Sequence, residues 1–208
     1  MPDLRIAVPR GALFTDTLDL LDTLGIDTAE VRANDRKLLF EEAGIITMRP
    51  SDVPTYVESG AADIGIIGKD VLLEQNDRAV HELVDLKYGR CVMVLASVAG
   101  EDRAAEALKR LGVMRVATKY PRIATHYFQD TGRQVEIVEV KGSVELAPLT
   151  GMVEAIVDLT ATGTTLKENN LVIREEIAVS TARLIANPVA DKLKAKAIDA
   201  LLERIGGR

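Results

Sequence analysis

An acid, a glycine and four threonines are concentrated between Asp158 and Thr165. The apolar run Ala155–Val157 predicts a buried strand that ends at Asp158 and leads into a helix start near Leu166. Backbone N–H groups at a helix start attract anions, and a glycine lets the backbone approach a phosphate closely. The segment therefore predicts a phosphate-binding loop made by Thr160, Ala161, Thr162, Gly163, Thr164 and Thr165.

Two carboxylates accompany this loop. Asp158 lies directly before it, where a carboxylate can accept hydrogen bonds from the vicinal hydroxyls of a ribose. Glu154 lies four residues earlier, and alternation along a strand predicts that it shares a face with Asp158. The same residues also fit a plain strand, turn and threonine-capped helix without a ligand. They fit neither a Walker loop, which needs Gly-Lys-Thr, nor a Rossmann fingerprint, which needs three spaced glycines.

The elements that must position these residues alternate between strand-length apolar segments and segments of helical period. This alternation predicts a parallel α/β architecture. A length of 208 residues favours two lobes, with a break near Gly89–Arg90. Strands are predicted at 4–9, 45–48, 62–68, 91–97, 115–118, 135–140, 155–159 and 177–185, and the longer helices at 13–24, 103–111, 123–130 and 188–205.

Composition excludes several classes of function. A net charge of −6 and an aromatic content of 3% disfavour a nucleic-acid partner, which clustered cations and stacking rings would hold. The single cysteine, Cys91, rules out an intrachain disulfide and favours a reducing compartment. The N-terminus does not resemble a signal peptide, and no apolar run is long enough to span a bilayer. A cytoplasmic protein with no membrane partner is therefore expected.

The stretch from Glu154 to Leu166 resembles the phosphoribosyl-pyrophosphate loop of the ATP phosphoribosyltransferase family. Other segments are similar to the same family in the same order, and together they cover nearly the whole chain. They are Val8–Leu13, Arg49–Pro54, Ala62–Asp70, Asp85–Gly89, Thr118–Pro121 and Lys141–Pro148.

The resemblance implies a reaction and a fold. The phosphoribosyl group of phosphoribosyl pyrophosphate would pass to N1 of ATP, giving phosphoribosyl-ATP and pyrophosphate with Mg²⁺ present, the first step of histidine biosynthesis. The family fold is a two-lobed α/β structure like the type II periplasmic binding proteins, with the active site in the interlobe cleft. The family chain returns to its first lobe, which implies residues 1–90 plus 172–208 for that lobe. Residues 91–171 would then form the second lobe and carry the loop.

The resemblance also implies partners. The chain stops at Arg208 without the regulatory domain of the long family form. It is therefore identified with the short catalytic form, which works with a separate regulatory subunit resembling histidyl-tRNA synthetase, as a homodimer within a hetero-oligomer. One position departs from the family pattern: Ala12 stands where the family often has arginine, which puts one phosphate contact in doubt.

Further site residues come from the matching motifs. Arg10 and Arg49 lie beside Gly or Pro at predicted strand ends, and guanidinium groups bind phosphate bidentately. Both are predicted to contact ATP or pyrophosphate, although they are also compatible with solvated surface arginines. Asp70 is a candidate for a nucleotide hydroxyl or amine, or for helix stabilisation. Glu145 is a candidate for the donor ribose or a surface acid. Lys87 and Lys119 are less specific candidates.

The predicted mechanism depends on positioning and electrostatics, because adenine N1 already carries a lone pair. Asp158 and Glu154 would orient the ribose, the loop would hold the 5-phosphate, and Arg49 with Mg²⁺ would steady the leaving pyrophosphate. A solute-binding or sensing module on the same fold is one rival interpretation. A purine or orotate phosphoribosyltransferase is another, but those enzymes usually carry two adjacent acids, and here Leu159 follows Asp158.

Overall fold

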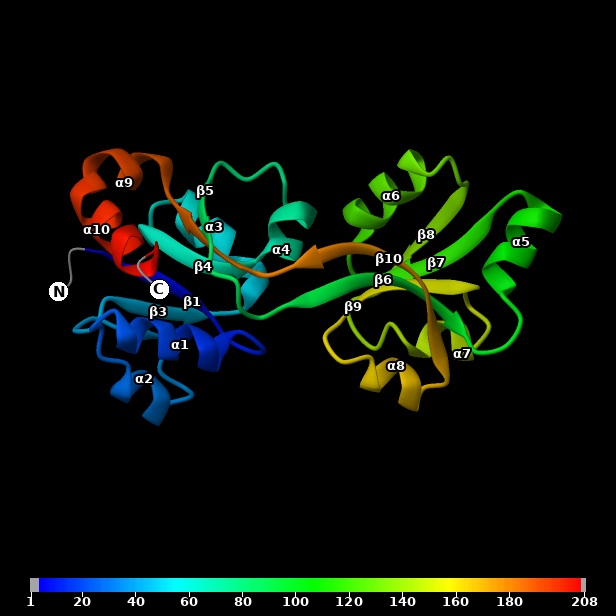
Figure 1. The fold of residues 1–208 in the computed structure, drawn as a ribbon, viewed down its shortest axis with the longest axis horizontal. Helices are drawn as coiled ribbons and strands as arrows, with labels where there is room; N and C mark the ends of the chain where they lie inside the picture. Colours follow the sequence, from blue (N-terminus) through cyan, green and yellow to red (C-terminus); the bar gives the residue numbers. More distant parts are fainter. Residues whose placement is uncertain (1–3, 207–208) are drawn as a thin grey trace. The chain divides into compact units, whose positions relative to one another are not determined.

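The computed structural model describes residues 4–206 and divides the chain into two α/β units (Figure 1). Unit 1 contains the residues up to Gly89 and those from Thr181 onward, and unit 2 is Arg90–Ser180. The return to unit 1 comes later than the predicted boundary at residue 172. The reason is that the segment before Thr181 is a long strand that pairs within unit 2.

Unit 1 is built on a six-stranded mixed sheet. Its strands are β1 (Ile6–Pro9), β2 (Leu39–Phe40), β3 (Ile45–Met48), β4 (Ile64–Gly68), β5 (His81–Asp85) and β11 (Ala182–Ala186). The order across the sheet is β2-β3-β1-β4-β11-β5. β1 runs parallel to β3 and to β4, whereas β11 runs antiparallel to both of its neighbours. The strand returning from unit 2 thus enters the first sheet between β4 and β5.

Helices cover both faces of this sheet. They are α1 (Phe14–Thr23), α2 (Ala29–Ala33), η1 (Pro50–Asp52), α3 (Val53–Glu58), α4 (Lys69–Glu74), α9 (Pro188–Leu193) and α10 (Ala195–Gly206). Leu18 of α1, Val31 of α2 and Leu201 of α10 belong to one apolar cluster, while Val57 of α3 belongs to a second. Two packed layers around one sheet explain why its inner strands β1, β3, β4 and β11 are almost entirely buried, whereas the edge strands β2 and β5 are not.

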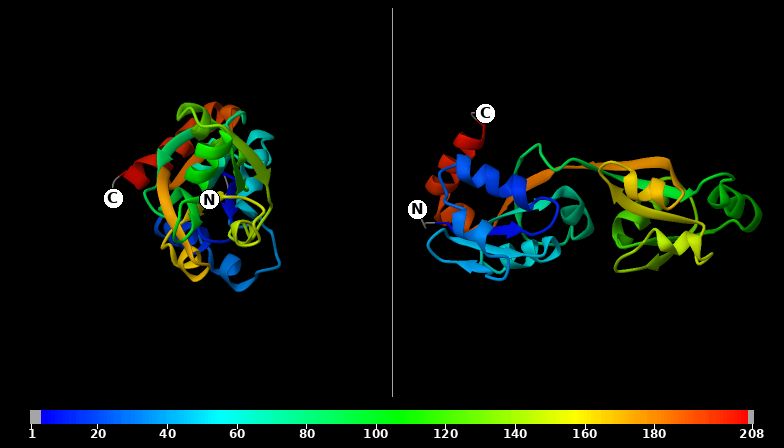
Figure 2. Two further views of the ribbon diagram at one scale, coloured as in Figure 1. Left: turned by 90° about the vertical axis from the view of Figure 1, so that its right-hand side faces the viewer. Right: turned by 90° about the horizontal axis from the view of Figure 1, so that it is seen from below.

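Unit 2 repeats the plan with five strands. They are β6 (Cys91–Val98), β7 (Met114–Thr118), β8 (Val135–Glu139), β9 (Ala155–Thr160) and β10 (Leu171–Ser180), in the order β10-β6-β9-β7-β8. β7 is parallel to β8 and β9. One face packs on α5 (Arg103–Leu111) and α6 (Pro121–Asp130). The other packs on α7 (Leu146–Leu149) and α8 (Thr164–Glu168), as Figure 2 also shows.

Two predicted elements are each divided in the structure. The strand predicted at 177–185 is the end of β10 followed by β11, with Thr181 between them. The Thr181 carbonyl accepts the Lys69 N–H, and its hydroxyl donates to Asp85 at 2.8 Å. The helix predicted at 188–205 is α9 followed by α10, with Lys194 at the break.

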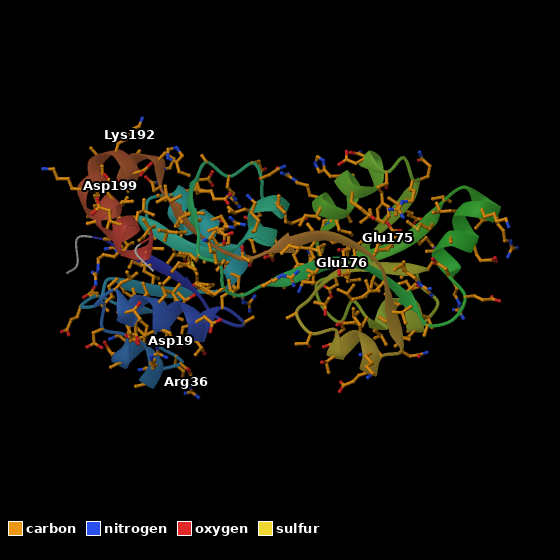
Figure 3. All side chains as sticks on the ribbon, viewed as in Figure 1. Asp19, Arg36, Glu175, Glu176, Lys192 and Asp199 are labelled. Atoms are coloured by element: carbon orange, nitrogen blue, oxygen red, sulfur yellow. The ribbon has the colours of Figure 1, made fainter. Side chains whose placement is uncertain are left out.

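The first half of β10 was missed because charged residues interrupt its apolar pattern. Glu175 and Glu176 lie beside each other on this strand (Figure 3). The two guanidinium nitrogens of Arg133 donate to Glu175 at 2.7 and 3.0 Å, and the Tyr127 hydroxyl donates to the same carboxylate. β5 and the short α2 were also absent from the prediction. No helix within residues 4–206 is long and apolar enough to cross a membrane.

Candidate functional site

The predicted phosphate loop follows β9 at the edge of the unit 2 sheet where β7 also ends. The parallel register pairs Thr118 with Val157, so the next residues, Lys119 and Asp158, are neighbours on strands about 5 Å apart. Side-chain alternation directs both toward the sheet face that α7 and α8 cover. The carboxyl ends of parallel strands are where ligands bind in open α/β folds.

Asp158 is held almost out of solvent, with 8% of its surface exposed. Its Oδ1 accepts the N–H of Leu159 at 2.8 Å, and residues 4–206 provide no ion-pair partner for its carboxylate. Burial raises the pKa of Asp158, the Leu159 N–H and the Lys119 charge oppose this rise, and the charge of Glu145 adds to it. These influences place Lys119 and Glu145 within electrostatic reach of Asp158. Lys119 was only a less specific candidate in the sequence, because the sequence does not show the register of β7 and β9.

The loop itself is open to solvent. Ala161, Thr162, Thr164 and Thr165 are exposed, and Thr160 and Gly163 are partly so. Gly163 has φ 74° and ψ 0°, a left-handed conformation that favours glycine and directly precedes α8. Nothing packs within 4 Å of the position where its Cβ would lie. The space beside Gly163 is therefore open, as a close approach of the backbone to a ligand would require.

The hydrogen bonds of the loop are mostly internal. The Gly163 N–H donates to Thr160 Oγ1 at 2.8 Å, and the hydroxyls of Thr162 and Thr164 lie 2.9 Å apart. In the described part of the chain, the N–H groups of Ala161, Thr162 and Thr165 have no protein acceptor. The arrangement leaves several donors available to an anion arriving from solvent.

Glu145 is half-buried at the start of α7. Val144 and Ala147, which precede and follow Glu145, belong to the apolar cluster between the sheet and α7 and hold the backbone at Glu145 in place. The Glu145 carboxylate remains outside that cluster and acts on Asp158 through its charge. The structure therefore brings together three of the predicted features in unit 2: the loop, Asp158 and Glu145.

Glu154 is not part of this group, which corrects the prediction that it orients the ribose with Asp158. It precedes β9, and four residues of strand separate it from Asp158 by about 13 Å. Its carboxylate accepts the Arg115 N–H at 2.6 Å and the Arg115 guanidinium at 2.6 Å. Burial alone would raise the pKa of Glu154, but the hydrogen bonds from Arg115 outweigh it and lower that pKa. Alternation correctly predicts a shared face, but the two carboxylates lie at opposite ends of the strand.

The two predicted arginines of unit 1 differ in their surroundings. Arg10 donates to Thr47 Oγ1 at 3.0 Å and to the Lys37 carbonyl at 3.1 Å, and its guanidinium lies 5.1 Å from the Phe14 ring centre. Arg49 is exposed after β3 and its carbonyl accepts the Asp52 N–H, but its guanidinium has no hydrogen-bond or ion-pair partner among residues 4–206. Arg10 is therefore committed to holding the loop before β2, whereas the Arg49 guanidinium is available.

Asp70 lies in the first turn of α4. Its Oδ1 occupies the space beside Gly68, since a Cβ added to that glycine would come within 2.1 Å of it. A carboxylate in this position favours the helix start electrostatically, which was one of the two interpretations of this residue. The nucleotide contact stays a prediction.

The residues described do not form a metal site of their own. Among residues 4–206, no group of three or more His, Cys, Asp and Glu side chains is arranged to hold an ion. Magnesium commonly keeps several waters and binds through substrate phosphates with one or two carboxylates.

Comparison with known proteins identifies related sequences over almost the full length. Residues 49–207 match the family model described as ATP phosphoribosyltransferase. A protein of that name from Rubrobacter xylanophilus is 53% identical, over 99% of this chain and 96% of the relative. Another from a Geobacillus species is 46% identical, over 97% of each protein.

Comparison with solved structures identifies the same family and a shared fold. The chain matches an ATP phosphoribosyl transferase (HisG:HisZ) complex from Thermotoga maritima with a TM-score of 0.80 and 36% identity, over 99% of this chain and 100% of that one. The periplasmic aliphatic sulphonate binding protein SsuA from Escherichia coli matches with a TM-score of 0.60 and 14% identity, over 97% of this chain and 70% of that one. The second likeness concerns the fold alone and confirms the predicted type II periplasmic-binding-protein-like architecture.

Proposed function

The chain belongs to the ATP phosphoribosyltransferase family, and we propose that it transfers the phosphoribosyl group of phosphoribosyl pyrophosphate to N1 of ATP. The products are phosphoribosyl-ATP and pyrophosphate, and the step opens histidine biosynthesis. One observation carries the proposal: a buried carboxylate in the second half of β9 is followed by an open Thr-Gly loop, several of whose backbone N–H groups have no acceptor among residues 4–206. The loop suits the 5-phosphate, and the carboxylate suits the ribose.

The donor is proposed to lie along the sheet edge of unit 2. The N–H groups of Ala161, Thr162 and Thr165 and the threonine hydroxyls donate to the 5-phosphate oxygens. Asp158 and Glu145 accept hydrogen bonds from the ribose hydroxyls. Positive charge grows on the ribose ring as the bond to pyrophosphate breaks, and a buried carboxylate is well placed to stabilise it. Glu154 has no role here because Arg115 occupies its carboxylate.

Arg49 is proposed to hold the departing pyrophosphate, because a free guanidinium can bind phosphate oxygens bidentately. Arg10 is a weaker candidate for a phosphate contact, since its guanidinium already binds protein. Asp70 is kept as a proposed contact to ATP. We further propose that magnesium arrives bound to the donor, where it would neutralise part of the diphosphate charge. None of the proposed residue roles depends on it.

The proposed assembly follows the family. The chain would act as the short catalytic subunit, forming a homodimer within a hetero-oligomer that includes a separate regulatory subunit resembling histidyl-tRNA synthetase. The matched Thermotoga maritima structure, described as a HisG:HisZ complex, supports this proposal. A cytoplasmic location is also proposed, because the proposed reaction is a step of amino-acid biosynthesis.

The decisive test is an absorbance assay for phosphoribosyl-ATP, with ATP, phosphoribosyl pyrophosphate and magnesium, run with and without the regulatory subunit. Product formation that requires both substrates is the expected result. A solute-binding or sensing module would bind a small ligand by calorimetry and form no product under either condition. Titration with phosphoribosyl pyrophosphate also separates the two, because an amino-acid sensor should not bind it.

A further inference from the structure

We propose that Lys119 is a donor-binding residue whose ammonium group contacts the diphosphate of phosphoribosyl pyrophosphate. This inference rests on the proposed function and assigns a contact on the opposite side of Asp158 from the 5-phosphate loop. It follows from strand register, from the surroundings of the lysine side chain and from the order of strands in the sheet.

Register brings Lys119 to the site. Thr118, the last residue of β7, pairs with Val157 of β9, so Lys119 lies beside Asp158, which is itself still paired with Val94 of β6. Ala117 and Ile156 belong to the cluster under α7, and alternation directs the residues two positions later toward the same face. Lys119 thus lies just beyond the end of β7 beside Asp158, and its charge acts on the Asp158 carboxylate.

The Lys119 charge is not neutralised by the protein. Several other lysines form ion pairs: Lys37 with Glu30, Lys69 with Glu82, Lys141 with Glu139 and Lys194 with Asp63. Within residues 4–206, Lys119 has no such partner, although its charge acts on Asp158. Its Nζ instead lies 5.2 Å from the ring centre of Tyr120. Tyr120 is itself 9% exposed, so a buried ring orients an exposed cation.

The order of strands in the sheet determines which part of phosphoribosyl pyrophosphate lies near the Lys119 ammonium group. β9 lies between β6 and β7. The loop after β9 continues into α8, which packs toward β10 beyond β6, whereas Lys119 follows β7 on the other side. In a ribose held at Asp158 by its 2- and 3-hydroxyls, the carbons bearing the 5-phosphate and the diphosphate project in opposite directions. A 5-phosphate in the loop therefore directs the diphosphate toward Lys119.

The test compares Lys119→Met with Lys119→Arg, and uses Lys109→Met on α5 as a control that removes an exposed lysine elsewhere in unit 2. Binding of phosphoribosyl pyrophosphate, inorganic pyrophosphate and ribose 5-phosphate is measured by calorimetry on the full chain. The steady-state KM for each substrate is measured with the regulatory subunit. Ribose 5-phosphate serves as the probe that lacks the diphosphate.

We expect Lys119→Met to weaken phosphoribosyl pyrophosphate and pyrophosphate binding by about tenfold or more, the effect of one charge-assisted contact. Ribose 5-phosphate affinity and the KM for ATP should change less than about twofold. Lys119→Arg should restore most of the loss, and Lys109→Met should match wild type.

Two results would overturn the inference. In one, Lys119→Met binds phosphoribosyl pyrophosphate as wild type does. In the other, it loses ribose 5-phosphate affinity to the same extent, which would indicate a general effect on the loop. A wild-type chain that binds neither phosphoribosyl pyrophosphate nor ribose 5-phosphate would instead overturn the proposed function itself.

Discussion

Glu154 directly precedes β9 and Asp158 lies within its second half, and although alternation directs both toward one side of the sheet, their surroundings are opposite. At the start of β9, Glu154 is held by the side chain and backbone of Arg115, and these bonds lower its pKa. At the end of β9, Asp158 accepts one N–H, has no ion-pair partner within residues 4–206 and has its pKa raised by burial. One carboxylate is satisfied by the protein, and the other has a single N–H donor and no ion-pair partner among residues 4–206.

The contrast teaches how a parallel sheet separates stability from chemistry along one strand. The amino ends of β7 and β9 are joined by the Arg115–Glu154 ion pair, which supports the register of the two strands. That register aligns Lys119 with Asp158 at the carboxyl ends. Unit 1 repeats the contrast in its cations, because the Arg10 guanidinium is bound to protein and the Arg49 guanidinium has no partner among residues 4–206.

The largest expected effect comes from exchanging each carboxylate for its amide. Asp158→Asn should reduce kcat/KM by about 10²- to 10³-fold, because it removes charge beside a developing cation. Glu154→Gln should stay within a few-fold of wild type. Steady-state assays of both variants at one pH measure the difference. Equal losses in the two variants would break the distinction between the ends of β9.

The arginines of unit 1 provide the second test. Arg49→Met should lower kcat/KM by roughly 10- to 100-fold, the effect of losing one charged hydrogen-bond donor to pyrophosphate, with an unchanged Tm. Arg10→Met should lower the Tm by a few degrees, since a chain of this size loses about 2–4 °C per kcal/mol. Calorimetric melts and kinetics on both variants separate binding from stability. If Arg49→Met were destabilised but kinetically normal, Arg49 would have a structural role and not the proposed role in pyrophosphate binding.

Stability against pH should change in opposite directions at the two ends of β9. The lowered pKa of Glu154 means that its charge stabilises the fold at neutral pH, and that this contribution is lost as pH falls through the lowered pKa. The Tm of Glu154→Gln should lie below wild type at pH 7, by roughly 2–4 °C for one charged hydrogen bond, and should approach it in acid.

For Asp158 the sign is reversed. Its raised pKa means that the protonated form is favoured in the folded chain, so the stabilising contribution exists at low pH and is lost as pH rises through the raised pKa. Asp158→Asn should therefore melt slightly above wild type at pH 7 and converge with it near the ordinary value of 3.8. Melts recorded across this range check both signs. A lower Tm for Asp158→Asn at pH 7 would contradict the account.

The smallest effect is expected in the loop. Gly163→Ala places a side chain on a residue with φ 74°, where space is free but the backbone is strained. The cost should be about 1 kcal/mol, or roughly 2–4 °C in Tm, with a modest rise in the KM for phosphoribosyl pyrophosphate. Gly132→Ala offers a control at φ 66° in a turn of the same unit. A much larger kinetic effect at Gly163 would mean that phosphate approaches its Cα directly.

The local structure of the candidate site could be predicted because its elements are contiguous in the sequence. The apolar run before Asp158, the left-handed glycine and the exposed threonines all lie within one strand, one turn and one helix start. Local signals failed where partners are distant in sequence. Arg115 is 39 residues from Glu154, and Thr47 is 37 residues from Arg10. The sequence shows a carboxylate or a guanidinium but not the distant group that binds it in the folded chain.

By itself, the sequence determined the alternation of strands and helices, the two-lobed α/β fold, the family and the position of the Thr-Gly loop. These features depend on residue periodicity and on contiguous motifs. Only the tertiary structure decided that Glu154 is tied to Arg115, that Lys119 lies beside Asp158 and that β10 belongs wholly to unit 2. The physical reason is that strand pairing brings distant residues within a few ångströms, and a charged group acts according to its neighbours in space.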